Sequence, residues 1–307
     1  MIRLAVRVSR ERADVVLAEL LDLAPGGVEE VDLDGARVEY AVYGPPGELP
    51  ALPDLQALAG GAAVEVSTTE IADDWQERWR DFHKPVLIAA PAAEDEGAER
   101  ASGVPSIRVR PPWEPESVRP LEPATIELVI DPGQAFGTGG HASTRLCLAL
   151  LLELVAAEGA GRAVLDVGTG SGVLAIAAGR LGFAPLLGLD NELESVTAAA
   201  ENATENGVAL RTERFDLRAD PLPWLAAGPD PGRPEPGRTL VLANLLRPLL
   251  LDLCRAIDRP PAGVIAGGLL RRELDEISAA FADRHGLRER SRRTEGEWGA
   301  LWLASHG

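Results

Sequence analysis

Apolar and polar positions alternate at the start of the chain in a pattern that predicts a small α+β unit. Every second residue from 2 to 8 is apolar, as in a strand with one buried face. Residues 13–23 have the three- and four-residue apolar spacing of a helix, and Pro25 with two following glycines ends it. Helix-like and strand-like runs succeed one another over residues 2–8, 13–23, 28–33, 37–43, 52–58 and 63–71. Their order, βαββαβ, predicts a ferredoxin-like domain over residues 1–70.

A second pattern indicates a connection between two domains. Trp75, Trp79 and Phe82 recur at i, i+4 and i+7, and the residues between them are polar. This spacing is typical of an amphipathic helix. We expect a bridging helix over residues 71–84, followed by a second domain that spans residues 85–307.

From about residue 140 onward, apolar helices alternate with short apolar strands. The predicted helices are residues 145–156, 173–181, 192–205, 248–257 and 270–284. The predicted strands are residues 163–167, 186–189, 208–213, 239–243, 263–266, 287–293 and 298–304. Strands that alternate with helices indicate a parallel sheet covered on both faces. The prediction is therefore a doubly wound, Rossmann-like α/β fold with a mostly parallel seven-stranded sheet that ends in a hairpin.

Two stretches lack any periodicity. Residues 91–120 are rich in Pro, Glu and Gly and are predicted to be mostly loop, with a strand-like piece at 107–110. Residues 218–238 are rich in Pro, Gly and Asp and are predicted to form an exposed insertion.

Composition narrows the class of protein. The net charge of −18 disfavours direct contact with nucleic acid; it suits a basic protein partner, and equally a surface that is merely soluble. Cys147 and Cys254 lie in apolar runs without metal-ligand neighbours, so we expect core residues, a reducing compartment and no metal. No apolar run reaches the roughly 18 residues of a membrane span, and no signal peptide is visible. We expect a cytoplasmic monomer that does not enter a membrane.

The glycine-rich turn after the strand at 163–167 is the strongest chemical signal. Glycines at 168, 170 and 172 precede a helix, whose free N–H groups and partial positive charge favour a carboxylate or a phosphate. A dinucleotide fingerprint, G-x-G-x-x-G, requires glycine at position 173, where the chain has Val173. The observed G-x-G-x-G after Asp166 resembles motif I of class I methyltransferases. An ordinary glycine-rich turn is the alternative.

Asp190 ends the next predicted strand, about 20 residues beyond the glycine loop. A carboxylate at this place accepts hydrogen bonds from both ribose hydroxyls and repels a 2′-phosphate. The contact serves S-adenosylmethionine and NAD alike, so it supports a nucleoside cofactor without choosing between them. The alternative is that Asp190 only caps the helix that follows.

Three further segments point to one family. Residues 131–144 read DPGQAFGTGGHAST and resemble the DPGxAFGTGxHxxT segment of the ribosomal protein L-eleven (L11) methyltransferases, the PrmA family. Residues 241–245 (VLANL) resemble that family's V-A-N-[IL] motif, and residues 295–298 (EGEW) its closing E-E-W segment. The resemblance covers nearly the whole chain, including the predicted bridging helix.

The resemblance implies S-adenosylmethionine as the cofactor and assigns its contacts. The family's contacts fall on Thr144, Gly168, Asp190 and Asn244. We add further expected contacts from the glycine loop and from a glycine-rich loop able to fold over the cofactor, namely Gly170, Phe136 and Gly137. For Phe136, the alternative is a buried aromatic side chain in the hydrophobic core.

The resemblance also implies the reaction. It is methyl transfer to amines, lysine side chains or an N-terminal amine, of ribosomal protein L-eleven, which the N-terminal domain recognises. Asn244 is the expected acceptor for the amine's hydrogen bonds, and His141 is expected to orient or deprotonate it, unless it is only a structural residue of its loop. Rival hypotheses are a methyltransferase for another protein lysine or a small amine, an NAD-dependent dehydrogenase, and a binding module without activity.

The chain departs from the family pattern at a few places. It has Gly140 where the family usually has Thr, Ala142 and Ser143 where it has Pro-Thr, and Asn191 where a second acid is common. These changes leave the expected cofactor contacts in place and bear more on the protein substrate.

Overall fold

The chain of 307 residues forms two compact units, Met1–Phe82 and His83–Gly307. A computed structural model describes residues 2–13, 16–17, 20, 28–33, 35–44, 64–70, 83–89, 104–115, 125–132, 140–223 and 235–305. Within these residues, no helix is long and apolar enough to cross a membrane.

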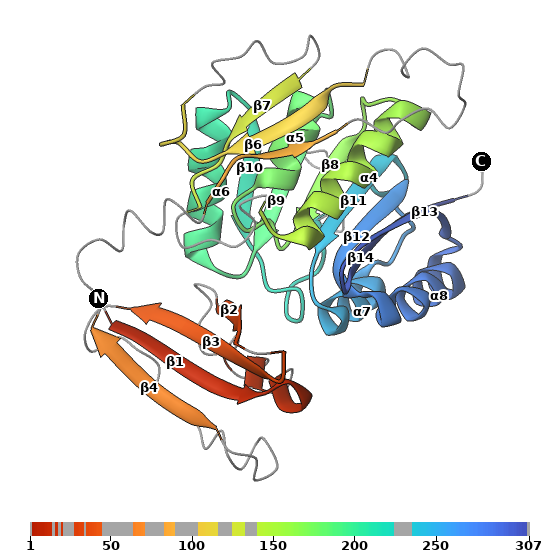
Figure 1. The fold of residues 1–307 in the computed structure, drawn as a ribbon. Coiled ribbons are helices and arrows are strands. Elements are labelled where there is room, and N and C mark those ends of the chain that lie inside the picture. Colours follow the sequence, from red (N-terminus) through yellow and green to blue (C-terminus); the bar gives the residue numbers. More distant parts are fainter. Residues whose placement is uncertain are drawn as a thin grey trace, which may run out of the picture. The chain divides into compact units, whose positions relative to one another are not determined.

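The N-terminal unit contains a four-stranded antiparallel sheet with the order β2-β3-β1-β4 (Figure 1). Strand β1 (Ile2–Ser9) pairs with β3 (Arg37–Gly44) on one side and with β4 (Glu65–Glu70) on the other. Strand β2 (Glu29–Asp32) pairs with the far edge of β3. Strands β1 and β2 therefore run parallel with β3 between them, the split arrangement of a ferredoxin-like sheet.

One face of this sheet is covered at helical spacing. Ala13, Val16 and Leu20 are buried against apolar residues of β1 and β3, after a 3-10 turn, η1 (Arg10–Arg12). The predicted helix at 52–58 and residues 71–82 of the predicted bridging helix lie outside the described residues.

The C-terminal unit is built on a seven-stranded sheet with the order β10-β9-β8-β11-β12-β14-β13. The first five of these strands are parallel. Strand β14 runs antiparallel to them, and β13 pairs antiparallel with β14, so the predicted fold class is confirmed. The strands are β8 (Ala163–Val167), β9 (Leu186–Asp190), β10 (Leu210–Arg214), β11 (Thr239–Asn244), β12 (Gly263–Leu270), β13 (Arg288–Glu295) and β14 (Trp298–Ala304).

Helices cover both faces of this sheet. Figure 1 shows α4, α5 and α6 on one face, and α7 and α8 on the other. Their bounds are α4 (Ala142–Glu158), α5 (Val173–Arg180), α6 (Leu193–Glu205), α7 (Arg247–Ala256) and α8 (Leu274–His285), with 3-10 turns η3 (Pro236–Arg238) and η4 (Arg271–Glu273).

The end of β12 corrects the sequence prediction. The sequence predicts a strand that ends at Ala266 and a helix that begins at Leu270, but β12 continues to Leu270 and α8 begins at Leu274. The register with β14 shifts between Ala266 and Leu269, and pairing resumes after this irregularity. The pairing with β14 thus carries the strand past two glycines that look like a strand end in sequence.

A third sheet is absent from the sequence prediction. Strands β5 (Val86–Ile88), β6 (Ser106–Arg110) and β7 (Thr125–Val129) form a small sheet in which β6 is central. It packs on the side of α4 and α5 that faces away from the large sheet (Figure 1). The strand-like piece predicted at residues 107–110 is confirmed as β6, but the sequence did not predict the sheet that β6 forms with β5 and β7.

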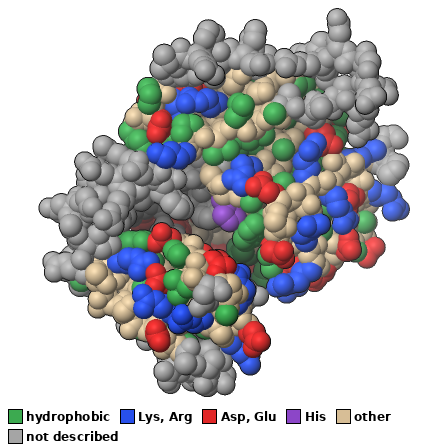
Figure 2. Space-filling view, in the orientation of Figure 1, with side chains coloured by type: hydrophobic (Ala, Val, Ile, Leu, Met, Phe, Trp, Pro, Cys, Tyr) green, Lys and Arg blue, Asp and Glu red, His purple; other side chains and the backbone are tan. Residues whose placement is uncertain are grey.

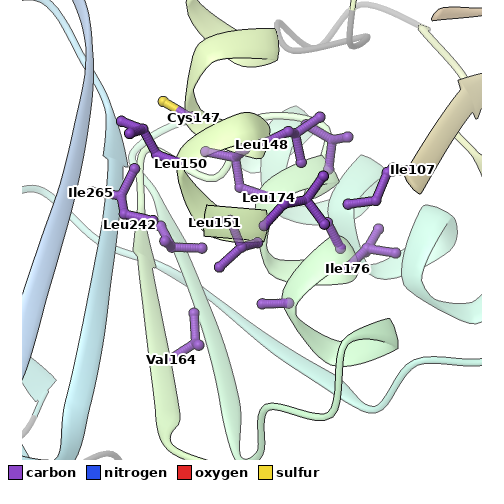
Figure 3. Packing of buried hydrophobic residues seen from close by; sticks show 14 of the residues in the cluster. Ile107, Cys147, Leu148, Leu150, Leu151, Val164, Leu174, Ile176, Leu242 and Ile265 are labelled. Carbon is purple, nitrogen blue, oxygen red and sulfur yellow. The ribbon is translucent and has the colours of Figure 1, made fainter. Parts of the chain in front are cut away.

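Helix α4 lies at the centre of the main core because sheets cover it on two sides. Its residues Leu148, Leu150 and Leu151 are fully buried, together with Ile107 of the small sheet and Leu242 of the large sheet (Figure 3). A helix enclosed in this way is expected to be apolar on every side, and residues 146–152 of α4 (LCLALLL) are all apolar. Consequently its N-terminus, which carries site residues, has a rigid base.

We predict that Leu151→Ala destabilises the protein by about 2–5 kcal/mol, because it leaves a cavity in this enclosed core. Leu87→Ala is the matched control, since Leu87 is 62% exposed, and it is expected to change the free energy of unfolding by less than about 0.5 kcal/mol. Urea unfolding of both variants measures the difference. Equal losses would show that α4 is not part of the main core.

Candidate active site

The predicted site residues gather at the carboxyl ends of three neighbouring parallel strands. Gly168 follows β8, Asp190 ends β9, and Asn244 ends β11, and β8 lies between the other two strands. Open α/β sheets bind their ligands at this edge.

The glycine loop leads from β8 into α5 through left-handed backbone. Gly168, Gly170 and Gly172 have φ angles of 72°, 52° and 81°. The N–H groups of Gly168 and Thr169 both donate to the carbonyl oxygen of Leu189 in β9, at 2.8 and 2.9 Å. The loop is therefore tied to the neighbouring strand, while the N-terminus of α5 faces the carboxyl edge of the sheet.

Two of these glycines also make room. A Cβ atom at Gly168 would lie 2.3 Å from Cδ2 of Leu245, and one at Gly172 would lie 3.1 Å from Cα of Ala199. The loop thus contacts the residue after Asn244 on one side and helix α6 on the other. Larger side chains would separate these three segments.

Asp166 supports the loop from below. Its carboxylate is buried and accepts hydrogen bonds from Oγ1 of Thr169 at 2.8 Å and from the N–H of Ala175 at 3.3 Å. Burial raises the pKa of Asp166 to about 7, against the lowering effect of these two bonds. Asp166 therefore connects the start of the loop, at Thr169, to the first turn of α5, at Ala175. Its buried position disfavours the charged form of the carboxyl group.

Asp190 faces the loop from the next strand. Its Oδ2 accepts from the N–H of Gly170 at 2.9 Å, and its Oδ1 accepts from the N–H of Glu192 at 3.1 Å. An ionised carboxylate has about four acceptor positions, so each oxygen can accept a further bond from a ligand. The carboxylate is thereby held in one orientation, which suits a pair of vicinal hydroxyls.

Asn244 and Thr144 form the other half of the site. The Nδ2 group of Asn244 donates to Oγ1 of Thr144 at 3.3 Å, and Thr144 is fully buried at the start of α4. Among the described residues, the buried Oδ1 of Asn244 has no hydrogen-bond partner. A buried acceptor without a donor is costly, so this atom marks a place where a ligand N–H or O–H fits.

Glycines of β12 give Asn244 its place. A Cβ atom at Gly267 would lie 3.1 Å from Oδ1 of Asn244 and 2.3 Å from Sγ of Cys147. At Gly268, whose φ is 77°, a Cβ atom would lie 2.6 Å from the carbonyl oxygen of Leu245. The glycine pair that ends the predicted strand in sequence is therefore a requirement of the site.

His141 is the N-cap of α4. Its Nδ1 accepts from the N–H of Ser143 at 3.3 Å and lies 2.8 Å from the Ser143 hydroxyl. Its ring meets that of Trp298 edge to face, with centroids 4.6 Å apart. Burial, followed by the nearby Arg145 cation, lowers the pKa of His141, against the opposing effect of Glu295. A neutral ring with an accepting Nδ1 carries its proton on Nε2.

The hairpin that ends the chain is fastened to the same helix start. Arg145 forms an ion pair with Glu295 at the end of β13, and its guanidinium also donates to the carbonyl oxygen of Gly140. The family-like segment at 295–298 therefore contacts the first turn of α4 through Glu295 and Trp298.

Hydrogen bonds join the expected cofactor residues in two pairs, Gly170 with Asp190 and Thr144 with Asn244. Gly168 lies against the side chain of Leu245, the residue that follows Asn244. Phe136 and Gly137 lie outside the described residues. No group of three or more metal-binding side chains occurs in the part of the chain that the structure describes.

Sequence reasoning missed one residue that contacts the site. Asn202 of α6 donates to the carbonyl oxygen of Ser171 inside the glycine loop. The sequence does contain a sign of this role, because Asn202 is a polar residue on the same helix face as the apolar residues Ala199 and Ala203, which are buried.

We predict that the stability of Asp166→Asn relative to the unmodified protein increases by roughly 1–3 kcal/mol between about pH 5 and about pH 8. The folded-state pKa of about 7 exceeds the ordinary 3.8, so the stabilisation by the protonated carboxyl is complete below the lower value and is lost as pH rises through the higher one. Urea unfolding at both pH values measures the difference. A difference that stays constant would show that Asp166 does not titrate in this range.

Comparison with known proteins identifies the family of the chain. The family described as "Ribosomal protein L11 methyltransferase (PrmA)" matches residues 54–305. A protein of Syntrophotalea carbinolica named ribosomal protein L11 methyltransferase is 36% identical over 245 residues, which cover 78% of this chain and 70% of that protein. One of the same name from Geobacter sulfurreducens is 34% identical over 296 residues, 92% of this chain and 85% of its own length.

A solved structure shares both sequence and fold. The crystal structure of a ribosomal protein L11 methylase from Lactobacillus delbrueckii subsp. bulgaricus is 32% identical, with a TM-score of 0.53, and the match covers 67% of this chain and 98% of the other. The family model and these relatives cover most of the chain. The chain belongs to the ribosomal protein L11 methyltransferase (PrmA) family.

Proposed function

We propose that this protein transfers methyl groups from S-adenosylmethionine to amines of ribosomal protein L11, either lysine side chains or an N-terminal amine. The observation that carries the proposal is the buried, unbonded Oδ1 of Asn244, held by Thr144 beside the glycine loop. Family membership supplies the class of reaction, and this atom supplies a place for the acceptor amine.

The residues present fit S-adenosylmethionine. The positive φ angles of Gly168 and Gly170 and the N-terminus of α5 form a cradle for the amino-acid part, where the helix dipole favours its carboxylate. Asp190 is oriented to accept from both ribose hydroxyls. With Thr144 and Asn244, these five residues would hold the cofactor, and Phe136 and Gly137 are proposed to cover it.

When bound, S-adenosylmethionine supplies a methyl group on a positively charged sulfur. An amine must be neutral to attack this methyl group, since its lone pair forms the new bond. Oδ1 of Asn244 is proposed to accept a hydrogen bond from the amine N–H and to aim the lone pair at the methyl group. The buried setting removes water from the amine and favours its neutral form.

His141 is proposed to position the site rather than to accept a proton from the amine. Its Nδ1 is already engaged with Ser143, and Nε2 carries the proton of the neutral ring. As the N-cap, it fixes the start of α4 and therefore the place of Thr144, three residues later. The edge-to-face contact with Trp298 holds the ring in this orientation.

The protein substrate is proposed from the names of the relatives. Proteins named for ribosomal protein L11 match both units of the chain, and the relative from Geobacter sulfurreducens covers 92% of it. We propose that residues 1–70 recognise the substrate, residues 71–84 bridge, and residues 85–307 catalyse. A ribosomal protein as substrate would place the reaction in the cytoplasm.

The surface charge is consistent with a protein partner. The net charge of −18 disfavours direct binding to nucleic acid. Figure 2 shows acidic side chains (red) interspersed with basic ones (blue) on the visible face, rather than one extended basic patch. We propose a monomer that contacts L11 directly, without nucleic acid or membrane.

We predict that the purified protein transfers radiolabelled methyl groups from S-adenosylmethionine to its cognate ribosomal protein L11, and that Asp190→Ala lowers cofactor affinity by about tenfold or more. The reason is the loss of the charge-assisted hydrogen bonds that Asp190 is proposed to accept from the ribose hydroxyls. Scintillation counting and calorimetry with S-adenosylhomocysteine measure the two effects. Label that enters another protein or a small amine, and not L11, would contradict the substrate and retain the cofactor.

We further predict that Asn244→Ala lowers kcat about a hundredfold while the Kd for S-adenosylhomocysteine changes by less than about tenfold, because the proposed bond orients the reacting amine. Asn191→Ala is the control, since this exposed asparagine follows Asp190 directly. It is expected to leave kcat unchanged. An Asn244→Ala variant with the kcat of the unmodified protein would show that the amine is held elsewhere.

A further inference from the structure

Two buried asparagines lie at the C-terminal end of helix α6. Asn202 lies within the helix, on the same face as Ala199, and Asn206 is the C-cap residue that follows it; they are 5% and 8% exposed. Each is a polar side chain with a donor and an acceptor that folding removes from water, so each requires partners.

Asn202 joins two segments that are distant in sequence. Its Nδ2 group donates to the carbonyl oxygen of Ser171 at 2.9 Å, and its Oδ1 accepts from the N–H of Asp131 at 2.9 Å. Ser171 lies within the glycine loop, and Asp131 begins the segment 131–144 that ends at Thr144. One side chain therefore bonds to the backbone of both segments proposed to contact the cofactor.

Asn206 makes a similar pair of bonds one turn later but to a different target. Its Oδ1 accepts from the N–H of Val129 at 2.9 Å, and its Nδ2 donates to the carbonyl oxygen of Val129 at 2.7 Å. The same Nδ2 group also donates to the carbonyl oxygen of Asn202 at 2.7 Å. Asn206 thus fastens the end of β7 to α6, and these three bonds do not reach the glycine loop.

The glycine loop needs such support. Gly168, Gly170 and Gly172 allow its positive φ angles but also give it many conformations when it is free. Helix α6 lies close to the loop, since a Cβ atom at Gly172 would be 3.1 Å from Cα of Ala199. A side-chain amide placed on α6, three residues after Ala199, can therefore reduce the entropy lost when a ligand orders the loop.

We propose that Asn202 is a positioning residue that holds the glycine loop and the start of segment 131–144 in the arrangement used to bind the cofactor. The inference rests on the proposed function for the identity of the ligand. The connection between the glycine loop and segment 131–144 rests on the two hydrogen bonds of Asn202.

The test compares Asn202→Ala with the matched variant Asn206→Ala. One removes a buried amide within α6 and the other removes a buried amide at its C-cap, so both are expected to lower Tm. Asn202→Ala is expected to weaken binding of S-adenosylhomocysteine about tenfold, measured by calorimetry, while Asn206→Ala leaves the Kd within about twofold. Asn202→Asp keeps the acceptor for Asp131 but loses the donor to Ser171, and it is also expected to weaken binding.

A second readout needs no ligand. Amide hydrogen exchange of residues 168–175 in the cofactor-free protein is expected to accelerate in Asn202→Ala and to remain unchanged in Asn206→Ala. Equal losses of affinity in the two variants, or an unchanged exchange rate in Asn202→Ala, would overturn the proposal. If the unmodified protein binds no S-adenosylhomocysteine, the proposed function fails, and the exchange comparison still decides whether Asn202 holds the loop.

Discussion

The site depends on the backbone between Val167 and Val173, where the chain turns from a buried strand into a helix through three residues with positive φ. Only glycine adopts this conformation without strain, and the absence of side chains lets Leu245 and Ala199 approach the loop from opposite sides. The hydrogen bonds to Leu189 then tie the turn to the next strand. A loop of this shape leaves the N-terminus of α5 open toward the edge where β9 and β11 end.

The remainder of the C-terminal unit fixes what surrounds this turn. Helix α4, enclosed between two sheets, provides a rigid base for Thr144 and hence for Asn244. The chain end contributes through Trp298 and Glu295, which contact the first turn of the same helix. Asp166 is retained below the loop although burial raises its pKa to about 7, an electrostatic cost located beneath the proposed cofactor site.

The sequence predicted the seven-stranded sheet well, because buried parallel strands read as short apolar runs separated by helices. It did not predict the small sheet, whose strands β5 and β7 are short and pair with β6 across long intervals of sequence. It ended β12 at a glycine pair that proves to be required by Leu245 and Asn244. It identified the carboxylate and amide residues at strand ends, where position alone suggests a role, but missed Asn202. A buried partner on a helix becomes visible only when the structure brings Ser171 and Asp131 to it.

The most direct test of the central claim is a crystal structure of the protein with S-adenosylhomocysteine. The account predicts the ribose hydroxyls on Asp190, the amino-acid part against Gly168 and Gly170, and the sulfur directed toward the side of the site where Oδ1 of Asn244 lies. A ligand bound away from the glycine loop, or a ribose that does not contact Asp190, would contradict it.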